Sequence, residues 1–235
     1  RAILKLSVEP KQQLTALLAV RDAPGLIKLA TRLKAEGGEF LSAMEFFSDV
    51  GLDITLENIP ELVFPLQNRT SFYLLVEAGS GSMQVPLDSI VTAVMEWGMD
   101  ENIIADGALA TSDSQRADFW RLREEQPEGQ RRLGAQLKHD LSVPPHRLDE
   151  FLDRANDKCD EILKGVRINA FGHLGDGNVH YNLSPPKGQR DFSGLGDEFS
   201  IKLGRLATLM GGSFAAEHGI GRTKVELTDL LREPA

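Results

Sequence analysis

Hydrophobic runs of strand length alternate along the chain with segments whose hydrophobic residues recur at helical spacing. The predicted strands cover 2–8, 14–20, 40–47, 71–77, 102–110, 136–143 and 166–171. The predicted helices cover 24–37, 86–99, 147–164 and 223–233, with an irregular or helical return at 48–62. The charged segment 112–134 predicts a surface helix followed by a polar loop, with Pro127 disturbing the helix end. This succession indicates an α+β or α/β structure in which helices pack on a sheet.

The order strand, helix, strand, helix occurs twice in the first half of the chain, which predicts internal pseudo-repeats at 12–62 and 70–134. We expect residues 1–235 to form one functional domain. Because the chain starts at Arg1 without an initiator methionine or a leader, we expect it to be a piece of a longer protein.

Composition and charge exclude several functional classes. The 235 residues are 41% hydrophobic and 26% charged, which is typical of a folded protein. A net charge of -9 disfavours binding to nucleic acid or to an anionic lipid surface. No apolar run approaches the ~20 residues that a transmembrane helix needs. Cys159, the single cysteine, has no partner for an internal disulfide, so we expect buried filler and a reducing, cytoplasmic location.

An Asp–Gly pair lies between two histidines in the second half of the chain. Asp176-Gly177 is a strong signal for a two-residue hairpin turn. Such a turn would place His173 directly opposite His180, with Asn182 on the same face. Opposed residues of antiparallel strands have Cβ atoms roughly 5 Å apart, so both imidazoles could reach one cation.

A third ligand for such a cation is offered by a glycine-rich segment, in which Glu217-His218 lies among four glycines. Glu217 would complete a His/His/Glu set, and a catalytic zinc site keeps a further position open for water or substrate. Spacing alone leaves two simpler interpretations open. The two histidines can belong to an ordinary surface hairpin, and the Glu–His pair can stabilise a helix cap or a turn.

Two motifs carry a resemblance to a known family: FGHLGDGNVHYN at 171–182 and EHGIG at 217–221. Together they resemble the C-terminal domain of FAD-linked oxidases, a class of flavin-dependent 2-hydroxyacid dehydrogenases with D-lactate, D-2-hydroxyglutarate and glycolate-oxidising members. The resemblance implies two ferredoxin-like units that form a largely antiparallel sheet covered by helices. It also implies FAD, bound mainly by an upstream domain, and oxidation of a D-2-hydroxyacid to the 2-oxoacid by hydride transfer to the flavin.

The resemblance also implies roles for the residues around the hairpin. His173, His180 and Glu217 would bind a divalent cation, usually zinc, and His218 would act as the general base. Manganese and iron suit the same ligands.

Three further residues would contact substrate by the same resemblance. Arg123 and Lys138 would bind the substrate carboxylate, and Asn182 would also contact the substrate. The D-2-hydroxyglutarate members carry a threonine four residues after this arginine, where this chain has Pro127. That departure counts against a dicarboxylate held in the same way.

The expected partners are a small 2-hydroxyacid and an electron acceptor, with a homodimer as an open alternative. Two other functions remain to be weighed. A metal-dependent hydrolase could use the same His/His/Glu site without a flavin, because a metal can activate water. A ferredoxin-like binding module would use the hairpin for structure alone.

Overall fold

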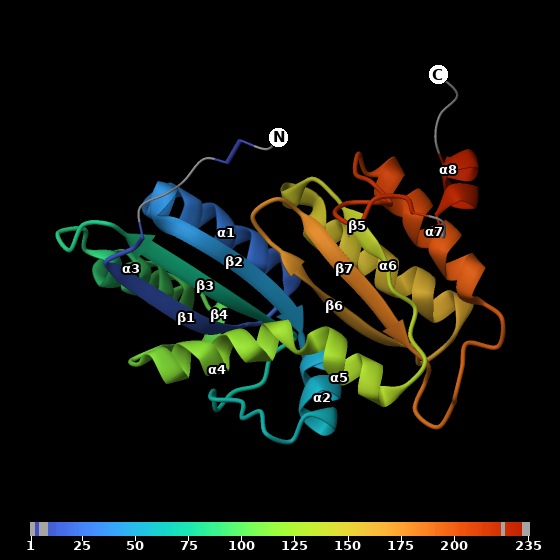
Figure 1. Cartoon of the computed structure of the whole chain (residues 1–235), viewed down its shortest axis with the longest axis horizontal. Coiled ribbons are helices and arrows are strands. Elements are labelled where there is room, and N and C mark those ends of the chain that lie inside the picture. The colour runs from blue at the N-terminus through green and yellow to red at the C-terminus, as the bar shows by residue number, and fades with distance from the viewer. Residues whose placement is uncertain (1–2, 5–8, 222–223, 232–235) are drawn as a thin grey trace.

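The computed structural model of this chain describes residues 3–4, 9–221 and 224–231, in which seven strands form one sheet (Figure 1). The strands are β1 (Gln12–Val20), β2 (Leu41–Ser48), β3 (Phe72–Ser80), β4 (Ile104–Leu109), β5 (Asp140–Ser142), β6 (Arg167–His173) and β7 (Asn178–Ser184). Their order is β4-β1-β3-β2-β6-β7-β5, and every neighbouring pair is antiparallel.

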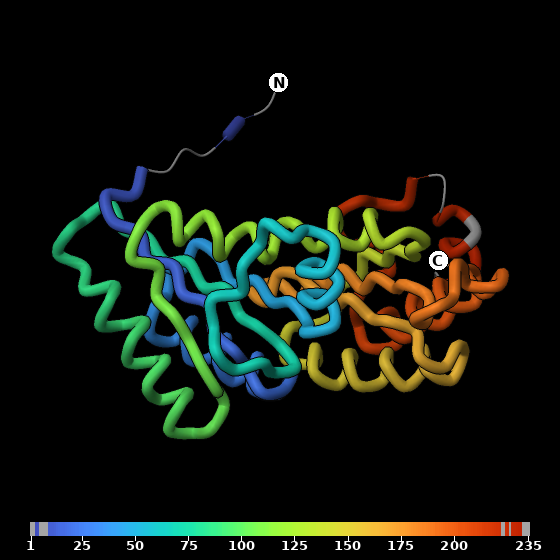
Figure 2. Tube along the Cα trace, turned by 90° about the horizontal axis from the view of Figure 1, so that it is seen from below, coloured from blue at the N-terminus to red at the C-terminus, as the bar shows by residue number. Residues whose placement is uncertain are grey.

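Eight α-helices are described, with two short 3-10 helices, η1 (Gly38–Phe40) and η2 (Pro145–Arg147). The α-helices are α1 (Ala23–Gly37), α2 (Asp49–Asn58), α3 (Leu87–Asp100), α4 (Asp113–Glu124), α5 (Gln126–Leu133), α6 (Leu148–Ile162), α7 (Gly196–Leu209) and α8 (Val225–Leu231). Seen along the edge of the sheet, α4 and α5 lie on one side and α1, α3 and α6 on the other (Figure 2).

The first four strands form a ferredoxin-like unit. They are connected as strand, helix, strand, strand, helix, strand, with α2 inserted between the second and third strands, and their order in the sheet is β4-β1-β3-β2. The segments 12–62 and 70–134 each contribute strand, helix, strand and helix, and their strands interleave within this single unit.

The last three strands form a second unit of the same kind. Its elements follow as β5, α6, β6, β7 and α7, and its strands have the order β6-β7-β5. After α7, Ser213 makes an isolated antiparallel bridge with Ser142 of β5, where a fourth strand would lie. The α+β fold with two ferredoxin-like units in a largely antiparallel sheet is therefore confirmed, although the described part of the second unit has no regular fourth strand.

Two buried apolar clusters hold the helices to the sheet. The larger one continues through both units beneath α1, α3, α6 and α7, and includes Leu18, Phe46 and Tyr181. Each such side chain contributes about 1.5–3 kcal/mol by leaving water. Cys159 is buried in this cluster, and burial raises its pKa to about 12, which fits the role of filler. The smaller cluster packs α2 and α4 on the opposite face and reaches Phe171 on β6.

Most of the predicted elements correspond to observed ones, and two predictions along the chain are wrong. The polar loop expected after the first helix of 112–134 is the helix α5, because Pro127 lies in the first turn of α5, where no backbone N–H donor is needed. The strand expected at 136–143 is reduced to β5, preceded by a single bridge at Leu137. The predicted strand at 2–8 lies mainly outside the described residues.

The hairpin of β6 and β7 has a different register from the predicted one. Phe171 faces His180, and His173 faces Asn178, so the two histidines are not directly opposed. The side-chain period of a strand is two residues, and the register differs from the predicted one by two. His173 and His180 therefore still lie on the same face, as diagonal neighbours.

The cause of this difference is the turn. Four residues, 174–177, connect the strands. A two-residue turn of type I′ needs positive φ at both central residues, and Gly177 has φ of 79° whereas Asp176 has no positive φ. Leu174 is buried and donates its N–H to the main-chain oxygen of Met44 at 2.8 Å, which fixes the start of the turn against β2.

A short pairing between β2 and β6 joins the two units. It covers residues 45–47 of β2 and 171–173 of β6, with Glu45 opposite His173. This pairing is the seam of the sheet, and it brings a carboxylate of the first unit next to a histidine of the second.

At the far edge of the sheet, His139 precedes β5 and is buried. Its Nδ1 lies 2.9 Å from the main-chain oxygen of Tyr181, and its Nε2 lies 3.1 Å from Oγ of Ser200 on α7. Burial lowers the pKa of His139 to about 4, and the charge of Lys224 acts in the same direction, against the hydrogen bond to Tyr181. The folded protein therefore holds this histidine neutral at pH values where an unfolded chain would protonate it.

This difference predicts a loss of stability in acid that depends on His139. Below about pH 6.5 the unfolded state takes up a proton that the folded state refuses until about pH 4, so stability falls as pH falls through this window. Between about pH 7.5 and about pH 5, the free energy of unfolding should decrease by about 2 kcal/mol more in the wild type than in His139→Gln. Urea unfolding in the presence of a chelator measures the free energy of unfolding of the wild type and of His139→Gln at each pH. If the free energy falls equally in the two proteins, the prediction is wrong.

Candidate active site

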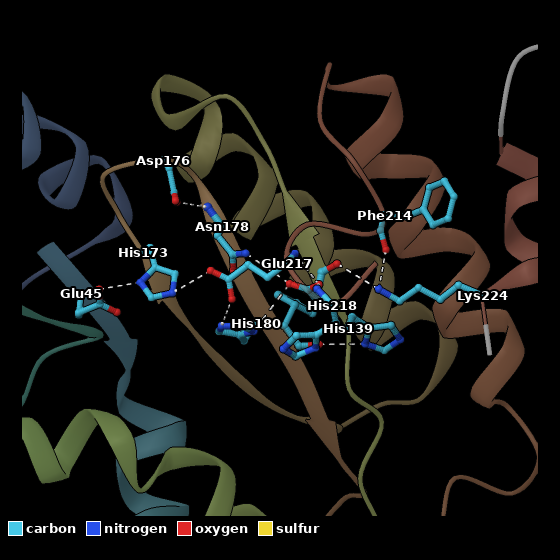
Figure 3. Close-up of polar contacts among 12 residues, drawn as sticks. Glu45, His139, His173, Asp176, Asn178, His180, Phe214, Glu217, His218 and Lys224 are labelled. Atoms are coloured by element: carbon cyan, nitrogen blue, oxygen red, sulfur yellow. Dashed lines mark hydrogen bonds and ion pairs between the residues drawn. The ribbon is translucent and has the colours of Figure 1, made fainter. Parts of the chain in front are cut away.

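The site lies where the smaller apolar cluster ends. On the face of β6 and β7 that continues from Phe171, the side chains become polar, with His173 on β6 and His180 and Asn182 on β7. The loop between α7 and α8 brings Glu217 and His218 over these strands (Figure 3). Segments far apart in the sequence therefore meet on one polar surface at the C-terminal unit.

His173, His180 and Glu217 each present one ligand atom, and these atoms all lie within 4.8 Å of one another. Nε2 of His173 is 3.2 Å from Oε1 of Glu217, and Nε2 of His180 is 3.9 Å from Oε2 of Glu217. Bonds of about 2.0–2.2 Å to a tetrahedral ion place its ligand atoms roughly 3.3–3.6 Å apart. The spacing fits a divalent cation, and three protein ligands leave a position for substrate.

The surroundings of His180 favour its neutral form. Burial and the nearby positive charge of Arg123 lower its pKa to about 4, against the opposing influence of Asp140. A neutral imidazole is the form that binds a metal. The ring of His218 stacks beside that of His180, with centroids 5.9 Å apart.

Asp140 of β5 fixes the loop that carries Glu217 and His218. Its Oδ2 accepts the backbone N–H of Glu217 at 2.9 Å and that of His218 at 2.8 Å, while its Oδ1 accepts from Nδ2 of Asn178 at 3.3 Å. Burial opposes ionisation, but the two backbone donors and the charge of Lys224 hold the pKa of Asp140 below its usual value. An ionised buried carboxylate thus holds both loop residues.

A cavity of about 460 Å³ is lined by two of the three potential ligands, His180 and Glu217. The residues predicted to contact substrate all line it, together with two of the potential ligands and the predicted base: Arg123, Lys138, Asn182, His180, Glu217 and His218. Its wall also includes Pro127, His139, Asp140, Phe171, Ile220 and Lys224. The structure therefore brings together every residue predicted for the site, since His173 joins through the ligand cluster.

Arg123 is a buried cation whose guanidinium contacts Glu45 and Phe171. Its Nη2 lies 3.0 Å from Oε2 of Glu45, and its guanidinium lies over the ring of Phe171, 4.7 Å from the centroid. Burial lowers the pKa of Arg123, and the charge of Glu45 opposes that shift. Its Nε is buried and has no partner within the described structure. A small anion in the cavity could accept from such a guanidinium.

Three residues of the site were missed from the sequence: Glu45, Asp140 and Lys224. Glu45 interrupts an apolar strand, and a charged residue in a buried strand is uncommon unless it is paired, so its position was a usable signal. Lys224 donates from Nζ to the main-chain oxygen of Phe214 at 3.0 Å, a contact that no local pattern reveals. Burial lowers the pKa of Lys224.

A larger groove, of about 1160 Å³, lies between the start of α1, the start of α2 and α6, and residues of both units line it. Several aspartates line it, including Asp49, Asp153 and Asp157. Among the described residues, none of its lining side chains belongs to a group of three potential metal ligands. The group of three potential metal ligands therefore lies at the smaller cavity and not at this groove.

Several enzymes have sequences similar to that of this chain. The chain is 29% identical over 226 residues to the mitochondrial D-2-hydroxyglutarate dehydrogenase of Arabidopsis thaliana, which covers 94% of this chain and 39% of the relative. It is 30% identical to the D-2-hydroxyglutarate dehydrogenase of Xanthomonas citri, with coverages of 95% and 46%. A D-2-hydroxyglutarate–pyruvate transhydrogenase of Saccharomyces cerevisiae is 29% identical, with coverages of 92% and 44%. The chain thus spans less than half the length of these relatives.

Solved structures share the fold at low sequence identity. p-Cresol methylhydroxylase aligns with a TM-score of 0.61 at 11% identity, covering 87% of this chain and 45% of that one. Alkyldihydroxyacetonephosphate synthase aligns with a TM-score of 0.55 at 13% identity, covering 94% and 44%. Within the described residues, no helix combines the length and the apolar character needed to cross a bilayer.

The sequence also matches a family described as "FAD linked oxidases, C-terminal domain", and the match covers residues 9–235. This match includes both motifs on which the resemblance was based, so the resemblance is confirmed. The chain belongs to the family of FAD-linked oxidase C-terminal domains.

Proposed function

We propose that this chain is the substrate- and metal-binding part of an FAD-dependent oxidoreductase that oxidises a D-2-hydroxyacid to the corresponding 2-oxoacid. The observation that carries the proposal is the cavity in which a His/His/Glu ligand set adjoins Arg123 and Lys138. Family membership and the names of the relatives, which are D-2-hydroxyglutarate dehydrogenases, support the same class of reaction.

The cationic side chains of the cavity would hold the substrate carboxylate. Arg123 offers the permanent positive charge of its guanidinium, and Lys138, an exposed residue on the cavity wall, offers a compact positive charge. Asn182 lies buried on the same face as His180 and offers an amide to the substrate. Fixing the carboxylate in this way orients the C2 carbon and its hydroxyl, which accelerates reaction by positioning.

Oxidation also requires removal of two hydrogens, one from carbon and one from oxygen. A cation held by His173, His180 and Glu217 would lower the pKa of the substrate hydroxyl, while the flavin supplies the acceptor for the hydride from C2. His218 lines the cavity and would accept the hydroxyl proton on its imidazole. The C2–O bond then becomes the carbonyl of the 2-oxoacid.

The proposal names the class of D-2-hydroxyacids, with the achiral glycolate included, and no single substrate within that class. Pro127 lines the cavity and has neither a hydroxyl nor a backbone N–H to offer a second carboxylate, whereas Lys138 and Lys224 supply charge on the same wall. D-lactate, glycolate and D-2-hydroxyglutarate therefore all remain within the proposal. Zinc is the proposed cation, and manganese or iron would suit the same ligands.

The cofactor, the partners and the location of the protein complete the proposal. FAD would be bound mainly by another domain, and the electron acceptor and a homodimer stay predictions. The cytoplasmic location also stays a prediction, since several relatives are named as mitochondrial. A metal-dependent hydrolase or a non-catalytic module would use the same fold, but membership of an FAD-linked oxidase family favours the oxidoreductase.

Removing one proposed ligand should remove the cation. The wild type, incubated with Zn²⁺ and desalted, should retain about one ion per chain, and His180→Ala should retain much less because two ligands remain. His146→Ala is the matched control, since His146 is exposed in η2 and lies outside the ligand cluster. Atomic absorption gives the metal content. Equal zinc in the wild type and His180→Ala would refute the ligand assignment.

Substrate oxidation should be visible by dye reduction in the flavin-loaded protein that contains this chain. We expect a D-2-hydroxyacid from a panel that contains both enantiomers of lactate and of 2-hydroxyglutarate, or the achiral 2-hydroxyacid glycolate, to reduce the dye. The fixed cavity walls and the single proposed base should make the enantiomers unequal. If no member of the panel is oxidised, the proposed activity is wrong.

Replacing the proposed base should separate proton transfer from metal binding. His218→Asn should lower kcat by about 10²–10⁴-fold, the usual contribution of a general base. Its zinc content should equal that of the wild type, because His218 is not one of the three potential ligands. Steady-state kinetics and metal analysis check the two parts, and an unchanged kcat would exclude His218 as the base.

A further inference from the structure

We propose that Glu45 is a positioning residue that fixes the tautomer and the direction of the His173 side chain. His173 is one of the three metal ligands of the proposed function, and this inference rests on that function. Glu45 lies on β2, in the first unit, whereas the three proposed ligands belong to the second. A residue of the first unit would thereby prepare the metal site of the second.

The backbone places Glu45 beside His173 before any side-chain contact is considered. The two residues are register partners across the seam, so their side chains leave adjacent strands on the same face. Glu45 is buried, with 7% of its surface exposed. A carboxylate so far from water is costly unless both of its oxygens are satisfied.

The two oxygens of Glu45 have different partners. Oε1 lies 2.7 Å from Nδ1 of His173, and Oε2 lies 3.0 Å from Nη2 of Arg123 (Figure 3 shows the histidine contact). The first distance is that of a strong, charge-assisted hydrogen bond. The carboxylate is thus held between a histidine and a permanent cation.

The contact with Glu45 determines which nitrogen of His173 can bind a cation. A carboxylate has only acceptor atoms, so Nδ1 of His173 must carry the hydrogen of the bond. In a neutral imidazole the lone pair then lies on Nε2, which is the atom 3.2 Å from Glu217. Glu45 therefore selects the tautomer whose free nitrogen faces the other ligands, as carboxylates behind metal-bound histidines do.

Arg123 supplies the charge that makes this arrangement stable. Its guanidinium is buried against Phe171 and pairs with Glu45, so the negative charge of Glu45 is compensated inside the protein. Removing one partner of such a buried pair leaves the other uncompensated. Because Arg123 remains charged at all working pH values, Glu45 retains a permanent partner on the side away from His173.

Glu45→Gln is the informative variant because both partners of Glu45 donate, while a glutamine has a single acceptor oxygen. The charged donor Arg123 forms the stronger bond, so the amide oxygen should turn toward it. The amide NH₂ then faces His173 and favours the tautomer with the proton on Nε2. That tautomer has no lone pair on the atom that faces Glu217.

Two measurements on the 235-residue chain test this inference. Competition with a chromogenic chelator should show that Glu45→Gln binds Zn²⁺ about 10–100-fold more weakly than the wild type. In imidazole ¹H–¹⁵N spectra of the metal-free chain, Nδ1 of His173 should carry a proton in the wild type and lose it in the variant, whereas Nε2 can donate to Glu217 in both. Unchanged zinc affinity together with an unchanged tautomer would overturn the proposal.

Glu77→Gln is the matched control for a hydrogen-bonded, half-buried carboxylate in the same sheet. Glu77 lies on the neighbouring strand β3 and accepts from Oγ1 of Thr15 at 3.2 Å and Nε1 of Trp120 at 2.9 Å, away from the ligand cluster. This variant should keep the zinc affinity and the His173 tautomer of the wild type. A parallel loss of zinc in both variants would mean a general effect on the sheet and would refute a specific role for Glu45.

The two measurements also separate this inference from the proposed function. If the wild type binds no Zn²⁺, the proposed metal site is wrong, while the tautomer of metal-free His173 still decides whether Glu45 acts on it. If the wild type binds Zn²⁺ and Glu45→Gln behaves like the wild type in both measurements, the metal site stands and the proposed role of Glu45 is wrong.

Discussion

Three residue pairs between β2 and β6 connect a four-stranded unit to a three-stranded one and make them a single sheet. Both units could satisfy most of their backbone hydrogen bonds without this seam, because each has its own internal strand pairs. The site could not exist without it. Arg123 and Glu45 come from the first unit, and the three potential metal ligands come from the second.

The seam also marks a change in the character of one sheet face. The opposite face is mainly apolar, and its cluster continues through both units. On the site face, the apolar cluster reaches Phe171 and stops, and the next side chains along β6 and β7 are histidines and an asparagine. One face thus supplies stability to the whole sheet, which leaves the other free to carry polar groups where the units meet.

Sequence patterns were sufficient for features that depend on local order. Strand and helix periods located most elements, and the two histidines were correctly placed on one face because a strand repeats every two residues. The register was wrong because Asp176 does not adopt the positive φ that a two-residue turn requires. Glu45 and Asp140 were missed for another reason. Glu45 is 128 residues from His173, and Asp140 is 77 residues from Glu217, so only the strand order brings these partners together.

The bridge between Ser142 and Ser213 has a consequence for the solubility of the whole sheet. β5 is an edge strand, and unpaired edge strands invite pairing with other chains. Here the N–H and C=O of Ser142 bond to Ser213, and the main-chain oxygen of Asp140 accepts from Ala216 at 3.3 Å. The loop that carries Glu217 and His218 thus blocks the outer edge of β5. A chain that lost this loop would lose part of its candidate site and would also expose a template for aggregation.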